Sequence, residues 1–145
     1  GFREHVSVNY SFNVIDERPE TIRQTVAYHR ELERIFGADK VEPAIFFIGL
    51  QPHTHLEQYG FDQGLIKPGY NPMSMLPWTA RQLLWNPEPM GSTFGRICLE
   101  AFERNPADFG RTVMDLLERD YGLAPLEEAL HAPLEGRAAL ATATR

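Results

Sequence analysis

The first third of the chain constrains its fold most strongly. Apolar and polar side chains alternate over residues 6–15, which is typical of a strand with one apolar face. Apolar residues then recur at helical spacing over 19–36, and a continuous apolar run covers most of 41–50. The order strand, helix, strand predicts one βαβ unit of a parallel sheet.

In a parallel sheet, functional sites gather at the carboxyl ends of the strands. The loops over 16–21 and 51–55 follow the two predicted strands, so they are the expected location of chemistry. The polar side chains singled out in these loops are Asp16, Arg18, Glu20, Gln51, His53 and His55.

The polar face of the first strand carries Asn9, Ser11 and Asn13. Because a crossover helix follows, we expect the apolar face to pack under helices and the polar face to line a barrel or a cleft. A half-exposed antiparallel strand would show the same alternation, so that alternative stays open.

The rest of the chain divides by composition. Closely spaced prolines and glycines over 67–91 predict an irregular arm with one short helix over 77–84, anchored by Trp78 and Trp85. Apolar stripes and capping residues predict a helical extension over 92–135. We expect the last residues, 136–145, to form a disordered tail.

Composition excludes several classes of function. The net charge of −6 argues against a general nucleic-acid binder, and no run of about 18 apolar residues could span a membrane. Cys98 is the single cysteine, so one chain forms neither a disulfide nor a cysteine-based metal site, and the expected compartment is the reducing cytoplasm. We expect Cys98 to be a buried packing residue and His29, within the charged helix, to be exposed.

Two stretches resemble radical S-adenosylmethionine enzymes. Residues 9–21, which include Asp16-Glu17-Arg18-Pro19-Glu20-Thr21, resemble a late barrel strand of that family and the turn that starts its helix. The strand over 45–49 with the following Gln51-Pro52-His53-Thr54-His55-Leu56 is similar to the final barrel strand. The phrases 47–56 and 77–87 look most like the subgroup with an N-terminal cobalamin-binding domain, and the resemblance covers 6–133.

The resemblance implies an α/β fold in which 1–66 form the last strands and helices of a partial (β/α) TIM-like barrel, followed by the arm and the helical extension. It also implies a four-iron cluster and S-adenosylmethionine as cofactors, with cobalamin as a further cofactor of the subgroup. In that family the reduced cluster cleaves S-adenosylmethionine to a radical that abstracts hydrogen from substrate.

One departure from the family is decisive for this reading. The cluster-binding Cys-x-x-x-Cys-x-x-Cys is absent, and Cys98 alone cannot ligate a four-iron cluster. The resemblance therefore implies a C-terminal fragment that is inactive alone and ligates none of these cofactors by itself. Its expected partners are the upstream part of the same barrel and a small-molecule or lipid-like substrate.

The resemblance also implies roles for the residues singled out above. Cofactor contacts are expected from Asn9, Ser11, Asn13, Asp16, Glu20 and Gln51, and substrate contacts from Arg18, His53 and His55. A second departure is that Asp16-Glu17-Arg18 stands where many relatives have glycines.

Two other functions remain possible from the sequence. The arm and the C-terminal helices could form a non-catalytic protein-interaction module. A small metal-dependent α/β enzyme could instead use His53 and His55, with Glu57 as a further ligand, because imidazole and carboxylate groups suit zinc or iron.

Overall fold

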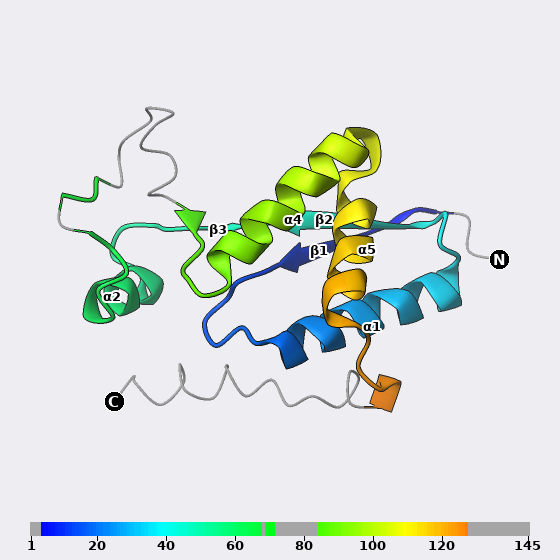
Figure 1. The fold of residues 1–145 in the computed structure, drawn as a ribbon, viewed down its shortest axis with the longest axis horizontal. Coiled ribbons are helices and arrows are strands. Elements are labelled where there is room, and N and C mark those ends of the chain that lie inside the picture. Colours follow the sequence, from blue (N-terminus) through cyan, green and yellow to red (C-terminus); the bar gives the residue numbers. More distant parts are fainter. Residues whose placement is uncertain (1–3, 68, 72–83, 128–145) are drawn as a thin grey trace.

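The computed structural model describes residues 4–67, 69–71 and 84–127 (Figure 1). The predicted helix over 77–84, apart from Leu84, and the predicted tail over 136–145 lie outside these residues, as does Trp78. In chain order the elements are β1 (Val6–Ser11), α1 (Pro19–Phe36), β2 (Val41–Phe46), β3 (Ile48–Gly49), α2 (His55–Asp62), β4 (Leu84–Trp85), α4 (Gly91–Arg104), the short 3-10 helix η2 (Pro106–Asp108) and α5 (Phe109–Tyr121).

The predicted βαβ unit is confirmed. Strands β1 and β2 pair in parallel, with Val6 opposite Val41 and Ser11 opposite Phe46, and α1 makes the crossover. Strand β1 is shorter than predicted because Asn13 adopts a left-handed conformation, with a φ of 57°, that a strand cannot continue through.

Helix α1 begins and ends where its sequence predicts. Pro19 occupies the first turn, where its missing N–H costs nothing, and the Thr21 hydroxyl accepts a hydrogen bond of 3.0 Å from the Arg18 backbone N–H. At the other end Gly37 adopts a φ of 99°, which a residue with a Cβ reaches only under strain.

The hydrophobic core lies on one face of the β1–β2 pair, under helices α1, α4 and α5 (Figure 1). Its buried residues are Tyr10, Phe12, Ile22, Val26, Phe94, Ile97, Ala101, Val113, Met114, Leu116 and Leu117. Helix α5 approaches β2 through Gly110, where an added Cβ would stand 1.7 Å from the Pro43 carbonyl oxygen. The glycine therefore sets how closely this helix packs on the sheet.

No described helix covers the opposite face of the β1–β2 pair. Ser7, Asn9 and Ser11 of β1 are exposed on it, and so is Phe46 of β2, whose side chain is 49% exposed. Residues opposite one another in a parallel pair project to the same side, so these side chains share one face. Strand β2 is thus buried on one face only, whereas its apolar run is typical of a strand buried on both.

The expectation that His29 is exposed is wrong. Its side chain is completely buried, and its Nδ1 is hydrogen-bonded to the Tyr10 hydroxyl at 3.1 Å. The Nε2 atom lies 3.4 Å from Glu33 Oε1, and Glu33 in turn forms ion pairs of 2.8 Å with Arg30 and Arg111. This network joins α1 to β1 and α5, so the polar side of α1 is partly an interior surface.

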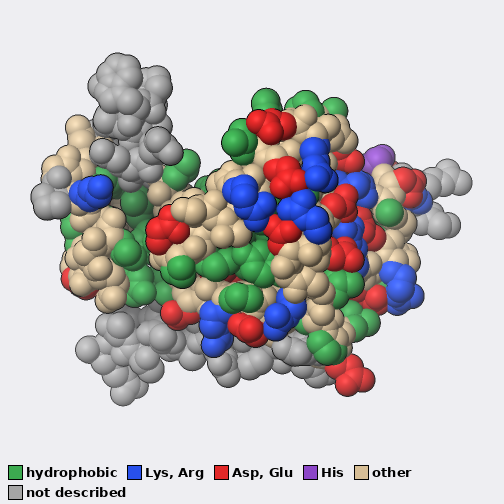
Figure 2. Space-filling model, in the orientation of Figure 1, with side chains coloured by type: hydrophobic (Ala, Val, Ile, Leu, Met, Phe, Trp, Pro, Cys, Tyr) green, Lys and Arg blue, Asp and Glu red, His purple; other side chains and the backbone are tan. Residues whose placement is uncertain are grey.

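Helices α4 and α5 carry acidic and basic side chains interspersed on their outer surface (Figure 2). Glu100 pairs with Arg119 and Arg104 at 2.7 Å each, and Asp120 pairs with Arg96 at 2.7 Å. Each of these five charges has a neighbour of opposite sign, so this part of the surface is no single-sign patch for a charged partner.

The described chain is therefore a mixed α/β structure with small sheets and several helices. None of its described helices combines the length and apolar character needed to cross a bilayer.

Candidate functional site

The carboxyl end of the β1–β2 pair carries the two hollows of interest. Strand β3 follows directly after β2 and pairs antiparallel with β4, with Ile48 opposite Trp85. This pairing places Trp85, which is distant in sequence from β1 and β2, at the end of the sheet where sites are expected. The Trp85 side chain, only 3% exposed, lines both hollows.

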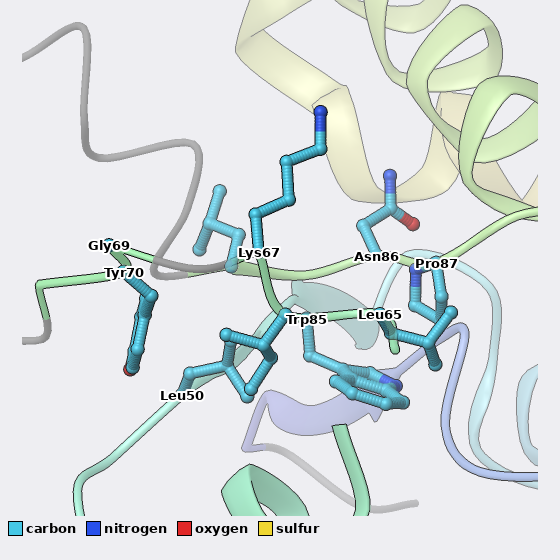
Figure 3. Close-up of a pocket in the computed structure, with 10 residues that line it drawn as sticks. Leu50, Leu65, Lys67, Gly69, Tyr70, Trp85, Asn86 and Pro87 are labelled. Atoms are coloured by element: carbon cyan, nitrogen blue, oxygen red, sulfur yellow. The ribbon is translucent and has the colours of Figure 1, made fainter. Parts of the chain in front are cut away.

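The first hollow has a volume of about 410 Å³ (Figure 3). It is bounded by Leu50, Leu65, Ile66, Lys67, Gly69, Tyr70, Leu84, Trp85, Asn86 and Pro87. Leu50, Ile66 and Trp85 form a small buried cluster of their own, against which Tyr59 and Tyr70 pack. This cluster supports the apolar part of the wall from behind, and polar groups form a comparable share of the lining.

The second hollow, of about 180 Å³, lies beside the first and shares Leu65, Trp85 and Pro87 with it. The turn after β1 supplies another part of its wall, namely residues 13–17. Two sequence-predicted site residues, Asn13 and Asp16, thus lie at this hollow.

Asn13 is held firmly. It is buried, and its Nδ2 donates to Asn86 Oδ1 at 2.7 Å and to the Pro87 carbonyl at 2.9 Å. The Asn86 amide in turn donates to the Gly91 carbonyl at 3.0 Å. These bonds tie the end of β1 to the start of α4, which makes Asn13 a residue that shapes the hollow.

Glu17 is a neighbour that sequence reasoning did not single out. Its carboxylate accepts a hydrogen bond from the Thr21 hydroxyl and lies at the second hollow. Burial raises the pKa of the Glu17 carboxyl above its ordinary value, although its hydrogen bonds oppose the shift. The sequence placed Glu17 in the predicted loop over 16–21, which was the one indication of a role at the site. The burial of Glu17 depends on the geometry of the turn, which no sequence pattern specifies.

Arg18 and Glu20 do not reach either hollow. Both are exposed at the start of α1, where Glu20 pairs with Arg23 at 3.3 Å. Arg18 occupies the position before the first helical turn. The contacts described for Arg18 and Glu20 therefore stabilise the first turn of α1.

The loop with Gln51, His53 and His55 is also exposed and lies outside both hollows. The Gln51 carbonyl accepts a hydrogen bond of 2.7 Å from Thr54, which caps α2. The His53 backbone N–H donates to the Glu57 carboxylate at 2.8 Å. Glu57 is thus engaged at the helix start, and in the described part of the chain no three His, Cys, Asp or Glu side chains form a metal-binding group.

Asn9 and Ser11 lie elsewhere again, exposed on the uncovered face of the β1–β2 pair. The structure therefore brings only Asn13 and Asp16 of the predicted residues to the hollows. Lys67, Tyr70 and Trp85 line the first hollow without having been predicted as site residues.

Two buried polar atoms near the first hollow lack a hydrogen-bond partner among the described residues. They are the Trp85 indole Nε1 and the Tyr70 hydroxyl oxygen. A buried donor left unpaired costs about 1–3 kcal/mol, and neither atom has accessible surface on the hollow.

Comparisons with protein-family models, with curated proteins and with solved structures found no match to this chain.

Proposed function

We propose that this chain is the C-terminal portion of a radical S-adenosylmethionine enzyme and completes the barrel of the parent protein. The uncovered, polar face of the β1–β2 pair carries the proposal. The sequence resemblance described above supplies the family, and the geometry below supports it.

In a (β/α) barrel the helices pack on the outer face of the strands, and the inner face lines the interior. Here α1 and α5 cover the face that holds Tyr10, while Asn9 and Ser11 project from the other face. The exposed Phe46 shares that face and would be buried once further strands close around it. A βαβ unit with one bare face is what the end of such a barrel would leave.

The hollows around Trp85 fit this proposal because they lie at the carboxyl end of the strands. Barrel enzymes bind substrate at that end. The turn after β1 and the β3–β4 pair would then form part of the substrate wall, with Asn13 fixing the turn through its bonds to Asn86 and Pro87.

The four-iron cluster does not fit the residues of this chain. Cys98 is a free thiol on α4, half-buried, and burial raises its pKa. One thiol with a raised pKa is a poor ligand and cannot hold a cluster. The ligands would have to come from the upstream part of the barrel.

Binding of S-adenosylmethionine by residues of this chain has partial support. Asn9 and Ser11 offer exposed polar groups on the proposed interior face, where they could contact the cofactor. The Asn13 amide is already bonded within the chain, so we assign it to positioning. The bound cofactors would supply the hydrogen-abstracting chemistry, and this chain would close the cavity and exclude water.

The test uses the protein encoded by this sequence together with the coding sequence that precedes it. We expect a Cys-x-x-x-Cys-x-x-Cys motif upstream, iron and sulfide uptake on anaerobic reconstitution, and release of 5′-deoxyadenosine from S-adenosylmethionine. Absence of the motif, or a reconstituted protein that releases none, would overturn the proposal.

A matched pair of variants tests the face itself. Ser11→Arg places a long cation on the proposed interior and should abolish 5′-deoxyadenosine release. Gly95→Arg is the control, because Gly95 on α4 has open space around it. Equal activity of the two variants would show that the bare face is not the barrel interior.

A further inference from the structure

Exposed large apolar side chains gather around the two hollows. Leu65 and Leu84, which are 44% and 48% exposed, line the first hollow, and Val14 and Ile15 line the second. Scattered exposed apolar residues are ordinary, but a group of them around a supported hollow marks a binding site. A volume of about 410 Å³ suits a small molecule rather than a protein segment.

Among the described residues, Lys67 is the one charged side chain that lines the first hollow. Lys67 is exposed and forms no ion pair within the described chain. The Trp85 indole Nε1 and the Tyr70 hydroxyl oxygen are buried and present no accessible surface to the hollow, and the Asn86 side chain is bonded to Asn13 and Gly91. No Asp or Glu is among the described residues that line this hollow.

Figure 3 shows how these groups are distributed. Lys67 and Tyr70 come from the segment after α2, and Trp85 comes from β4 across the hollow. Leu50 lies on the side of Tyr70, and Leu65 lies beside Pro87 on the other side of Trp85. A ligand with an apolar body and an anionic end would match the exposed leucines and the cationic Lys67.

We propose that the hollow bounded by Lys67, Tyr70 and Trp85 binds a small apolar molecule that bears a carboxylate. The inference deepens the proposed function, and rests on it for the role of that molecule as substrate. Lys67 attracts the carboxylate, and the exposed Leu65 and Leu84 contact the apolar body.

The test titrates the full chain with decanoate, a carboxylate with an unbranched apolar body, by isothermal titration calorimetry. We expect saturable binding to one site and much weaker binding of decyltrimethylammonium, which has the same chain and the opposite charge. Absent binding of decanoate, or equal binding of both amphiphiles, overturns the proposal.

A matched pair of variants locates the site. Lys67→Gln should weaken decanoate binding about fivefold, as loss of an ion pair at a partly exposed site predicts. Lys40→Gln removes the other lysine of the sequence, which precedes β2 and lies outside the hollow, and should leave binding within about twofold. Equal affinities of the two variants overturn the assignment of Lys67.

Nuclear magnetic resonance detects ligand binding without a substitution among the residues that line the hollow. The indole N–H resonance of Trp85 should shift on addition of decanoate, and Trp78→Phe identifies which of the two indole signals it is. An unmoved Trp85 signal at saturation overturns the placement of the ligand against Trp85. Because decanoate binding needs neither cluster nor S-adenosylmethionine, this result is independent of whether the longer protein releases 5′-deoxyadenosine.

Discussion

Acidification should destabilise this chain through His29. The ring is completely buried against Tyr10, and burial lowers the pKa of His29 below the ordinary value of 6.5. The nearby Glu33 opposes this shift, whereas Arg30 and Arg111 add to it. On unfolding the ring regains its ordinary pKa, so below about pH 6.5 the unfolded chain binds a proton that the folded chain does not.

The sign and size of the effect follow from this difference. Stability is complete above the unfolded pKa and is lost as the pH falls below it. From about pH 7.5 to about pH 5.5 the unfolded ring becomes protonated, which lowers the free energy of unfolding by up to about 1.4 kcal/mol for one histidine. Glu17 acts in the opposite sense, because burial raises the pKa of its carboxyl.

Urea denaturation followed by circular dichroism at both pH values measures the effect. The comparison is between the wild type and His29→Gln, which keeps a polar side chain and removes the titration. We expect the free energy of unfolding of the variant to change less with pH, by about 1 kcal/mol. The reasoning is refuted if both proteins show the same pH dependence, or if the wild type gains more stability on acidification than the variant.

Two further predictions concern backbone positions. Gly110→Ala should destabilise the chain by at least about 2 kcal/mol, because its Cβ would overlap the Pro43 carbonyl, whereas Gly95→Ala in open space on α4 should stabilise by about 0.5–1 kcal/mol. Equal thermal midpoints of these two variants would contradict this account of the α5–β2 contact. Asn13→Ala should cost about 2–3 kcal/mol, since it loses two hydrogen bonds and a residue tolerant of a φ of 57°. Asn13→Gly should be about 1 kcal/mol more stable than Asn13→Ala in urea denaturation, because glycine adopts a positive φ without strain although it also loses the hydrogen bonds. A less stable Asn13→Gly variant would refute the strain at this turn.

The order of elements was predictable because its signals are local. The apolar spacing over 19–36, with Pro19 before it and Gly37 after it, predicts α1 with its observed bounds. The alternation and the apolar run that flank it predict β1 and β2, and a helical crossover between them favours the parallel pairing that is observed. Each of these predictions uses only residues that are close together in the sequence, within one helix or one strand.

The candidate site was predictable only in part. The loop after β1 does form one wall, with Asn13 and Asp16, whereas His53 and His55 lie outside both hollows. Trp85 lies at the site because its strand pairs with the strand of Ile48, and no local sequence pattern predicts that pairing. Contacts between residues far apart in sequence depend on how the elements pack.

The sequence by itself determined the βαβ order, the ends of α1 and the separation of apolar and polar faces on β1. Only the tertiary structure decided that His29 is buried, because its partner Tyr10 stands 19 positions away on a strand that α1 must first pack against. The same is true of the hollows around Trp85. Periodicity specifies which face of an element is apolar, but burial and pairing depend on which other element covers that face.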